Sequence, residues 1–149
     1  MRLRLICLAL SSAVLASSIA AQTFSLEHFA NIARVADVRL APDGHRAVFV
    51  LAWPNYESNS YESEIVEVDL RTRAQRTLTQ RKTASSPRWS PDGDRLAFLA
   101  SVEGKAQLFV LPTRGGEAVQ VTRVSTGVRS FAWRPDGKAF AVVAAQAPP

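Results

Sequence analysis

The chain of 149 residues has one cysteine, one methionine and two histidines, and these shortages exclude several kinds of site. Cys7 follows no lipoprotein-like box and lies in a segment that we expect to be removed, so the remaining chain has no thiol for a disulfide, a metal or a nucleophile. His28 and His45 stand in no plausible arrangement with a serine and an acid, and we expect both on the surface. No G-x-S-x-G nucleophile elbow occurs. The sequence therefore predicts no catalytic, metal-binding or cofactor-binding residue.

The first twenty residues have the pattern of a secretory signal peptide. Arg2 and Arg4 supply a basic start, and an uncharged, mostly apolar run follows from residue 5 to residue 20. Small residues end the run, so we expect cleavage after Ala20, or alternatively after Ala21. The alternative interpretation is a membrane anchor, but the run is short for a span, which needs about 20 apolar residues. We therefore expect an exported protein, periplasmic or secreted, with no membrane contact after cleavage.

The charge of the remaining chain is mildly positive. Without residues 1–20, sixteen Lys and Arg stand against thirteen Asp and Glu, a net charge of +3. A basic cluster could suggest a nucleic-acid partner, but Thr and Gln interrupt it and it has no aromatic residue for stacking on bases. We interpret it as the solvated surface of a hairpin and expect no nucleic-acid partner. The cluster consists of Arg71, Arg73, Arg76, Arg81 and Lys82.

A Pro-Asp-Gly turn with matching flanks occurs three times. The segments RLAPDGHRAVFV (39–50), RWSPDGDRLAFL (88–99) and AWRPDGKAFAVV (132–143) align without gaps, and their glycines are 49 and 44 residues apart. A repeat of this length indicates an architecture of similar, stacked units. The turn residues are Pro42, Asp43, Gly44, Pro91, Asp92, Gly93, Pro135, Asp136 and Gly137.

Each residue of the turn has a structural role. Proline fixes φ near −65°, which suits the second position of a type I turn. The aspartate side chain accepts hydrogen bonds from nearby backbone amides, and glycine supplies the positive φ that closes a hairpin with a bulge. The alternative, that the aspartates are metal ligands or acids, is weaker because they stand at equivalent positions of separate units. The sequence predicts three β-hairpins.

The strand after each turn is almost entirely apolar, which predicts burial on both faces. These strands cover residues 47–50, 96–99 and 140–143. A second hairpin follows in the first two units. In the first of them, we expect Val66, Val68 and Leu70 to face one way and Glu67 and Asp69 to face the other. Four antiparallel strands per ~45 residues are typical of a β-propeller blade.

We therefore predict an all-β fold, a partial β-propeller of about two and a half four-stranded blades. Blade one covers about 35–79, blade two about 83–123, and half of blade three about 127–145. Trp89 and Trp133 occupy matching positions before the turn, and Phe49 and Phe98 occupy matching positions after it. We expect these four residues to pack between blades; stacking on a ligand is the alternative for the tryptophans.

Two features distinguish the first unit. The segment SLEHFANIAR (25–34) predicts a short helix with Ser25 as its N-cap. Residues 52–63, AWPNYESNSYES, form a longer polar loop that carries aromatic side chains and accounts for the longer first spacing.

The segments ARVADVRLAPDGHRAVFV, WPNYESNSYESEIVEVDL, SSPRWSPDGDRLAFLA and QLFVLPTRGGEAVQVT resemble the N-terminal part of bacterial prolyl-oligopeptidase-type serine peptidases. The acylaminoacyl-peptidase or dipeptidyl-peptidase-like branch is the most similar. The resemblance covers essentially all of the chain after the signal peptide. The Pro-Asp-Gly blade alone is less specific, because TolB-type propellers carry it too.

The resemblance implies a seven- or eight-bladed propeller followed by an α/β-hydrolase domain with a Ser-Asp-His triad. The implied partners are short peptide substrates, to which the propeller restricts access, and the family uses neither a metal nor an organic cofactor. None of the family's catalytic positions has a counterpart here, because the matching region is absent from the 149 residues.

The third unit ends after its second strand, which would leave an apolar strand as an open edge, an aggregation hazard. We therefore expect a truncated or partial gene product, an N-terminal propeller region that gates and positions peptides for a missing hydrolase domain. A non-catalytic periplasmic TolB-like propeller for protein–protein interaction and a nonfunctional remnant are the alternatives.

Overall fold

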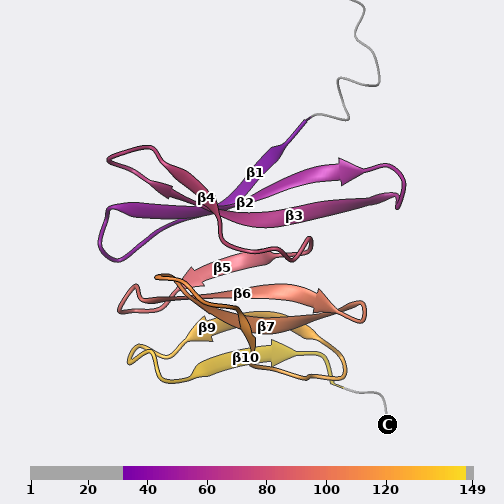
Figure 1. Cartoon of the computed structure of the whole chain (residues 1–149). Coiled ribbons are helices and arrows are strands. Elements are labelled where there is room, and N and C mark those ends of the chain that lie inside the picture. The colour runs from indigo at the N-terminus through magenta and orange to yellow at the C-terminus, as the bar shows by residue number, and fades with distance from the viewer. Residues whose placement is uncertain (1–31, 147–149) are drawn as a thin grey trace, which may run out of the picture.

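The computed structural model describes residues 32–146, which form ten β-strands in three antiparallel sheets (Figure 1). The described part contains no helix, and so none that could span a membrane. The predicted signal peptide and most of the predicted helix over 25–34 lie outside the described residues. The last residue of that helix, Arg34, begins the first strand instead.

The first sheet has the strand order β1-β2-β3-β4. Its strands are β1 (Arg34–Leu40), β2 (Arg46–Asn55), β3 (Ser60–Asp69) and β4 (Gln75–Thr77). The first Pro-Asp-Gly segment joins β1 to β2. The hairpin of β2 and β3 is regular from the pair Arg46 and Asp69 to the pair Asn55 and Ser60, so it extends as a long two-stranded arm.

The second sheet repeats this plan in the order β5-β6-β7-β8. Its strands are β5 (Ser85–Trp89), β6 (Arg95–Val102), β7 (Lys105–Pro112) and β8 (Val119–Gln120). The third sheet consists of β9 (Val128–Trp133) and β10 (Phe140–Ala144). The second and third Pro-Asp-Gly segments join β5 to β6 and β9 to β10.

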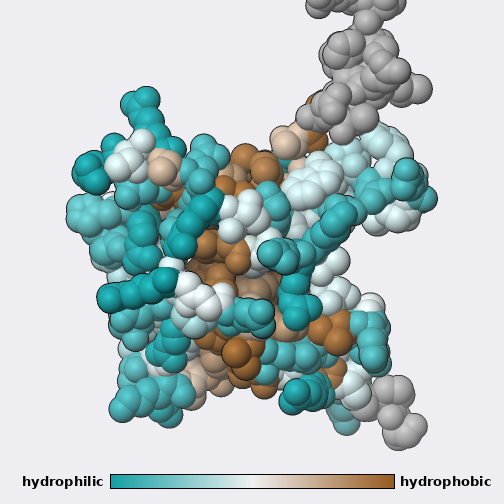
Figure 2. Space-filling view, viewed as in Figure 1, coloured by the Kyte–Doolittle hydropathy of each residue, from teal (hydrophilic) through white to brown (hydrophobic). Residues whose placement is uncertain are grey.

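The three sheets are stacked face to face in chain order (Figure 1). Alternate residues of β6 point to opposite neighbours, as the pleat of a strand requires. Phe98 is fully buried in an apolar cluster that includes Val48 and Ile65 of the first sheet, and Leu99 belongs to a cluster with Val128 of the third. Figure 2 shows apolar side chains gathered between the sheets with hydrophilic side chains around them.

The strand after the third turn is exposed, and this contradicts the prediction of burial on both faces. The side chains of β10 from Ala141 to Ala144 are exposed, and Val143 retains 56% of its accessible surface. The equivalent β6 is buried because it lies between sheets, whereas β10 pairs only with β9 and no described residue covers its outer face.

Candidate functional site

The three Pro-Asp-Gly segments adopt the same backbone geometry. Gly44, Gly93 and Gly137 have φ values of 70°, 74° and 67°, the left-handed region that glycine enters without steric cost. Each glycine amide donates to the carbonyl three residues earlier, as Gly44 does to Ala41 at 3.0 Å. The segments are therefore tight turns that place the strands on either side in antiparallel register.

Each turn aspartate accepts a backbone amide hydrogen two residues ahead, and all three have pKa values below the ordinary range. For Asp43 the main cause of the lowered pKa is the amide of His45, at 2.8 Å. For Asp92 the hydroxyl of Ser90 is the main cause of the lowered pKa, and for Asp136 it is the guanidinium of Arg134. The carboxylates are thus engaged within their own turns.

An arginine two residues after each of the first two turns reaches the next sheet. Arg46 donates to the carbonyl oxygen of Gly93 at 3.2 Å, and its guanidinium lies 4.9 Å from the ring centroid of Trp89. Arg95 repeats both contacts one sheet further along, with Gly137 at 2.9 Å and Trp133 at 5.0 Å. We call these two sets of contacts the arginine clamps.

The two tryptophans of the arginine clamps also donate hydrogen bonds to the preceding sheet. Trp89 Nε1 donates to the carbonyl oxygen of Arg39 at 3.2 Å, and Trp133 Nε1 donates to that of Arg88 at 3.0 Å. Each indole therefore bonds to the preceding sheet by its nitrogen and carries an arginine of that sheet over its ring. The structure places Phe98 in the core between the first two sheets, while Phe49 is only partly buried.

Glu67 of β3 is a buried acid. Its side chain is only 8% exposed and lies between two arginines, with Arg76 Nε at 2.9 Å and Arg46 at 3.7 Å. Its Oε2 has no hydrogen-bond partner. Arg76 also donates to the carbonyl of Thr113, in the turn after β7. A polar network therefore joins β4 of the first sheet to the turn between β7 and β8.

All five residues of the basic cluster are exposed, and the guanidinium groups of two of them also contact the rest of the protein. Arg76 takes part in the network around Glu67, and the guanidinium of Arg81 lies 4.2 Å from the ring centroid of Phe109. These two cations pack against the protein, which the prediction of a solvated hairpin surface did not include.

The first strands of neighbouring sheets are joined by Asp37. This residue lies in a β-bulge of β1 with φ of 48°, and its carboxylate contacts Arg39 at 2.6 Å and Arg88 of β5 at 3.0 Å. Ser86 has φ of 54° at the equivalent place in β5, so the bulge is repeated although the acid is not.

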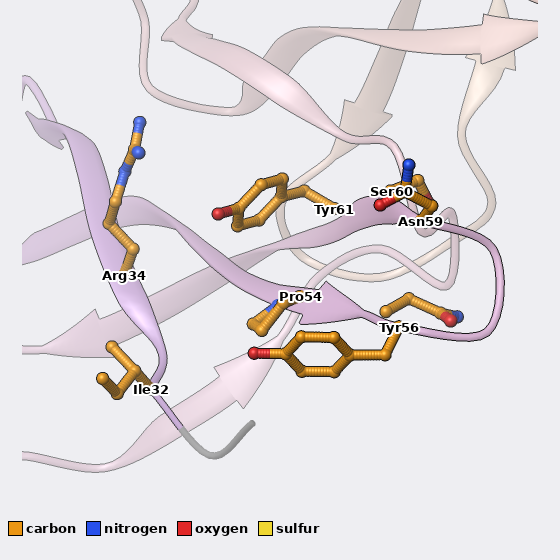
Figure 3. Close-up of a pocket in the computed structure, with 8 residues that line it drawn as sticks. Ile32, Arg34, Pro54, Tyr56, Asn59, Ser60 and Tyr61 are labelled. Carbon is orange, nitrogen blue, oxygen red and sulfur yellow. The ribbon is translucent and has the colours of Figure 1, made fainter. Parts of the chain in front are cut away.

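A cleft of about 300 Å³ lies between the arm of the first sheet and the start of β1 (Figure 3). Two tyrosines of the arm, Tyr56 and Tyr61, retain 64% and 69% of their accessible surface. The lining residues are Ile32, Arg34, Pro54, Asn55, Tyr56, Asn59, Ser60 and Tyr61. This cleft combines exposed aromatic rings with a guanidinium, a composition suited to recognition.

Polar side chains hold the tip of the arm. Asn55 donates to Glu62 at 2.8 Å and accepts the amide hydrogen of Ser58 at 3.1 Å. Lys82 pairs with Glu62 at 2.9 Å and ties the arm to the loop after β4. The bond from Lys82 is the main cause of a lowered pKa for Glu62.

The described residues hold no cluster of three or more His, Cys, Asp or Glu that could bind a metal. His45 is exposed beside the first turn, and His28 lies outside the described residues. Sequence reasoning missed the arginine clamps, although the aligned segments carry their signal: Arg46 and Arg95 stand at the same repeat position, while the third repeat has Ala139 there.

No family model matches the chain. Comparison with known proteins finds 42% identity over 113 residues to YuxL of Bacillus subtilis, an uncharacterized peptidase, and 32% identity over 113 residues to dipeptidyl-peptidase 5 of Porphyromonas endodontalis. These matches cover 74% and 75% of the chain but only 17% and 16% of the relatives, so the chain spans about a sixth of their length. A shorter match, 35% over 69 residues, covers 45% of the chain and 15% of the Tol-Pal system protein TolB of Bordetella avium.

Solved structures of peptidases are also similar to the chain in sequence and in fold. Acylaminoacyl peptidase of Pyrococcus horikoshii is 30% identical with a TM-score of 0.67, covering 78% of this chain and 18% of that one. The β-propeller domain of the Trilobed protease from Pyrococcus furiosus is 27% identical with a TM-score of 0.63, covering 76% of this chain and 34% of that one.

Proposed function

Because about three quarters of the chain is homologous to the propeller region of acylaminoacyl peptidases and dipeptidyl-peptidase 5, we propose that it forms propeller blades of an exported serine peptidase. In this role the blades gate and position peptide substrates for an α/β-hydrolase domain. The nucleophile would come from that domain, since no G-x-S-x-G occurs among residues 1–149. The three sheets are called blades one, two and three below.

The observation that carries this proposal is the 42% identity to a peptidase over 113 residues, supported by a shared fold with acylaminoacyl peptidase. The repeated clamps add a physical reason. Similar units joined by the same contacts follow one another with a constant rotation, which builds a closed or curved array. The first strand of each blade, β1, β5 and β9, would line the axis of that array.

A chimera tests the proposal. The aligned 113 residues of the Bacillus subtilis peptidase are replaced by those of this chain, and hydrolysis of chromogenic acyl-peptide and dipeptidyl substrates is measured. We expect turnover from the chimera and none from the 149-residue chain alone. A folded chimera without activity, or hydrolysis by the purified chain, would contradict the proposal.

Export is part of the proposal and rests on the N-terminal pattern. We expect the protein expressed in a bacterial host to reach the periplasm with a new N-terminus at Ala21 or Gln22, which mass spectrometry of the intact protein would detect. Retention of Met1 on a membrane-bound product would show an anchor instead.

The second candidate function is a non-catalytic propeller for protein–protein interaction, favoured by the match to TolB over 69 residues. This second function predicts a different result from the chimera experiment, namely a chimera that is folded but inactive. It also predicts that the chain binds a protein partner and has no effect on peptide hydrolysis by a peptidase.

A further inference from the structure

The cleft at the tip of the arm is built by an insertion that blade two lacks. Trp53 pairs with Glu62 in blade one, and Val102 pairs with Lys105 at the equivalent place in blade two. Residues 54–61 therefore stand where blade two has only the turn of residues 103 and 104. Most of the inserted residues line the cleft. The cleft is thus an addition to the repeated framework and is not needed to form the blade.

Among the described residues, the hydrogen bonds at the tip do not involve the side chains of Tyr56, Tyr61 or Arg34. Asn55, Ser58 and Ser60 bond among themselves and with Glu62. Among residues 32–146, the hydroxyls of Tyr56 and Tyr61 make no hydrogen bond, and no carboxylate lies within ion-pair distance of Arg34. Figure 3 shows both phenol groups directed toward the start of β1, where Arg34 and Ile32 lie.

These groups select a particular kind of ligand. A guanidinium without an acidic partner recognises a carboxylate, to which it can donate two parallel hydrogen bonds. Exposed tyrosine rings offer rigid apolar surface with a polar end and are enriched at recognition sites. A volume of about 300 Å³ is at the lower end of ligand sites, enough for a few residues of a peptide. Glu57, the acid of the turn, is not among the lining residues.

We propose that this cleft binds the carboxylate of a short extended peptide. Arg34 pairs with the carboxylate, while Tyr56 and Tyr61 pack against the adjoining side chain of the peptide and donate from their hydroxyls. This assignment rests on the proposed role of the blades in positioning peptides, and it names the peptide feature that blade one would recognise. The carboxylate comes from the C-terminus of the peptide or from an Asp or Glu side chain.

Fluorescence anisotropy with the purified full chain tests the proposal. The probes are an N-terminally labelled Ala-Ala-Phe-Ala peptide with a free C-terminus, its C-terminal amide, and the amide of Ala-Glu-Phe-Ala. We expect at least one of the two carboxylate probes to bind at least tenfold more tightly than the neutral amide, and the stronger of the two identifies the source. Equal binding of all three probes, or no binding of any, would overturn the proposal.

Substitutions test whether the tighter binding of a carboxylate probe depends on the cleft. Arg34→Gln should weaken binding of the carboxylate probe at least tenfold without changing that of the amide, and Arg34→Lys should retain part of it. Arg114→Gln is the matched control, since its side chain is 85% exposed and is not among the lining residues, and it should change nothing. Tyr56→Leu should weaken both probes.

One further result would separate the cleft assignment from the proposed function. If the chimeric peptidase is active but the chain binds the carboxylate and amide probes equally, the cleft assignment is wrong and the proposed function still stands.

Discussion

Arg95 of blade two lies over the indole ring of Trp133 in blade three, with its guanidinium 5.0 Å from the ring centroid. Arg46 and Trp89 repeat this arrangement between blades one and two at 4.9 Å. The same residue types thus meet in the same way at both interfaces, and a common contact sets each blade on the next. The clamps join the three sheets together with the apolar clusters that lie between them.

Removing an arginine of the clamp should destabilise the protein. We expect Arg95→Ala to lower the free energy of unfolding by about 1–2 kcal/mol, because it removes a cation–π contact, a hydrogen bond and side-chain packing. Urea unfolding followed by tryptophan fluorescence measures the change. Arg114→Ala, at an exposed position, should stay within about 0.5 kcal/mol of the parent. Equal effects of the two substitutions would show that the clamp contributes nothing.

The glycines of the turns should differ in their tolerance of a methyl group. Gly44→Ala should cost about 1–2 kcal/mol of stability, the strain of positive φ alone, because a Cβ there meets no atom within 4 Å. At Gly137 a Cβ would lie 3.3 Å from Arg95 and 3.4 Å from Pro91, so Gly137→Ala should cost about 1 kcal/mol more. Thermal or urea unfolding of the two variants checks this order, and a larger loss at Gly44 would contradict it.

The network around Glu67 should be sensitive to the loss of one partner and tolerant of the loss of both. Blade two has Val110 and Val119 at the positions equivalent to Glu67 and Arg76. Arg76→Val should destabilise by about 1–3 kcal/mol, below the usual effect of breaking a buried pair because Arg76 is half exposed. The double variant Glu67→Val with Arg76→Val should recover most of this loss in urea unfolding. A double variant less stable than the single one would contradict the account.

Acid should weaken the turns. The pKa values of Asp43, Asp92 and Asp136 are lowered in the folded state, so folding favours the ionised carboxylates. Their contribution is complete above the ordinary pKa of 3.8 and is lost as the pH falls through the lowered folded values. A triple Asp→Asn variant should therefore lose less stability than the parent between pH 5 and about pH 2.5. Identical pH profiles of the urea midpoint would show that these carboxylates do not contribute.

Much of the fold could be predicted from the sequence because its signals are local. Proline, aspartate and glycine in one order specify a turn by their own conformational preferences, and three copies indicate similar units. The four-stranded order of the first two sheets follows from the alternation and turn signals after each hairpin. The part of the fold that the sequence predicts, and that the structure has, is an all-β chain with three antiparallel sheets of the propeller type.

The remaining features depend on residues that are distant in the sequence. Burial of Glu67 requires Arg46 and Arg76 around it, and no pattern within β3 reveals them. The exposure of β10 depends on which strands lie beside it, while its own residues are as apolar as those of β6. The cleft needs Arg34 and the arm together. The sequence did indicate aromatic side chains over 52–63, but it predicted a loop where the structure has the ends of β2 and β3.

The most direct test of the central claim, that these stacked blades gate a peptidase, is the substrate-length preference of the chimeric enzyme. The quantity to measure is kcat/KM for a long unstructured polypeptide divided by kcat/KM for a short acyl-peptide. Loosening both interfaces with Arg46→Ala and Arg95→Ala should raise this ratio at least fivefold, because longer chains would pass between less tightly joined blades. An unchanged ratio in a folded, active chimera would show that the blades do not control access.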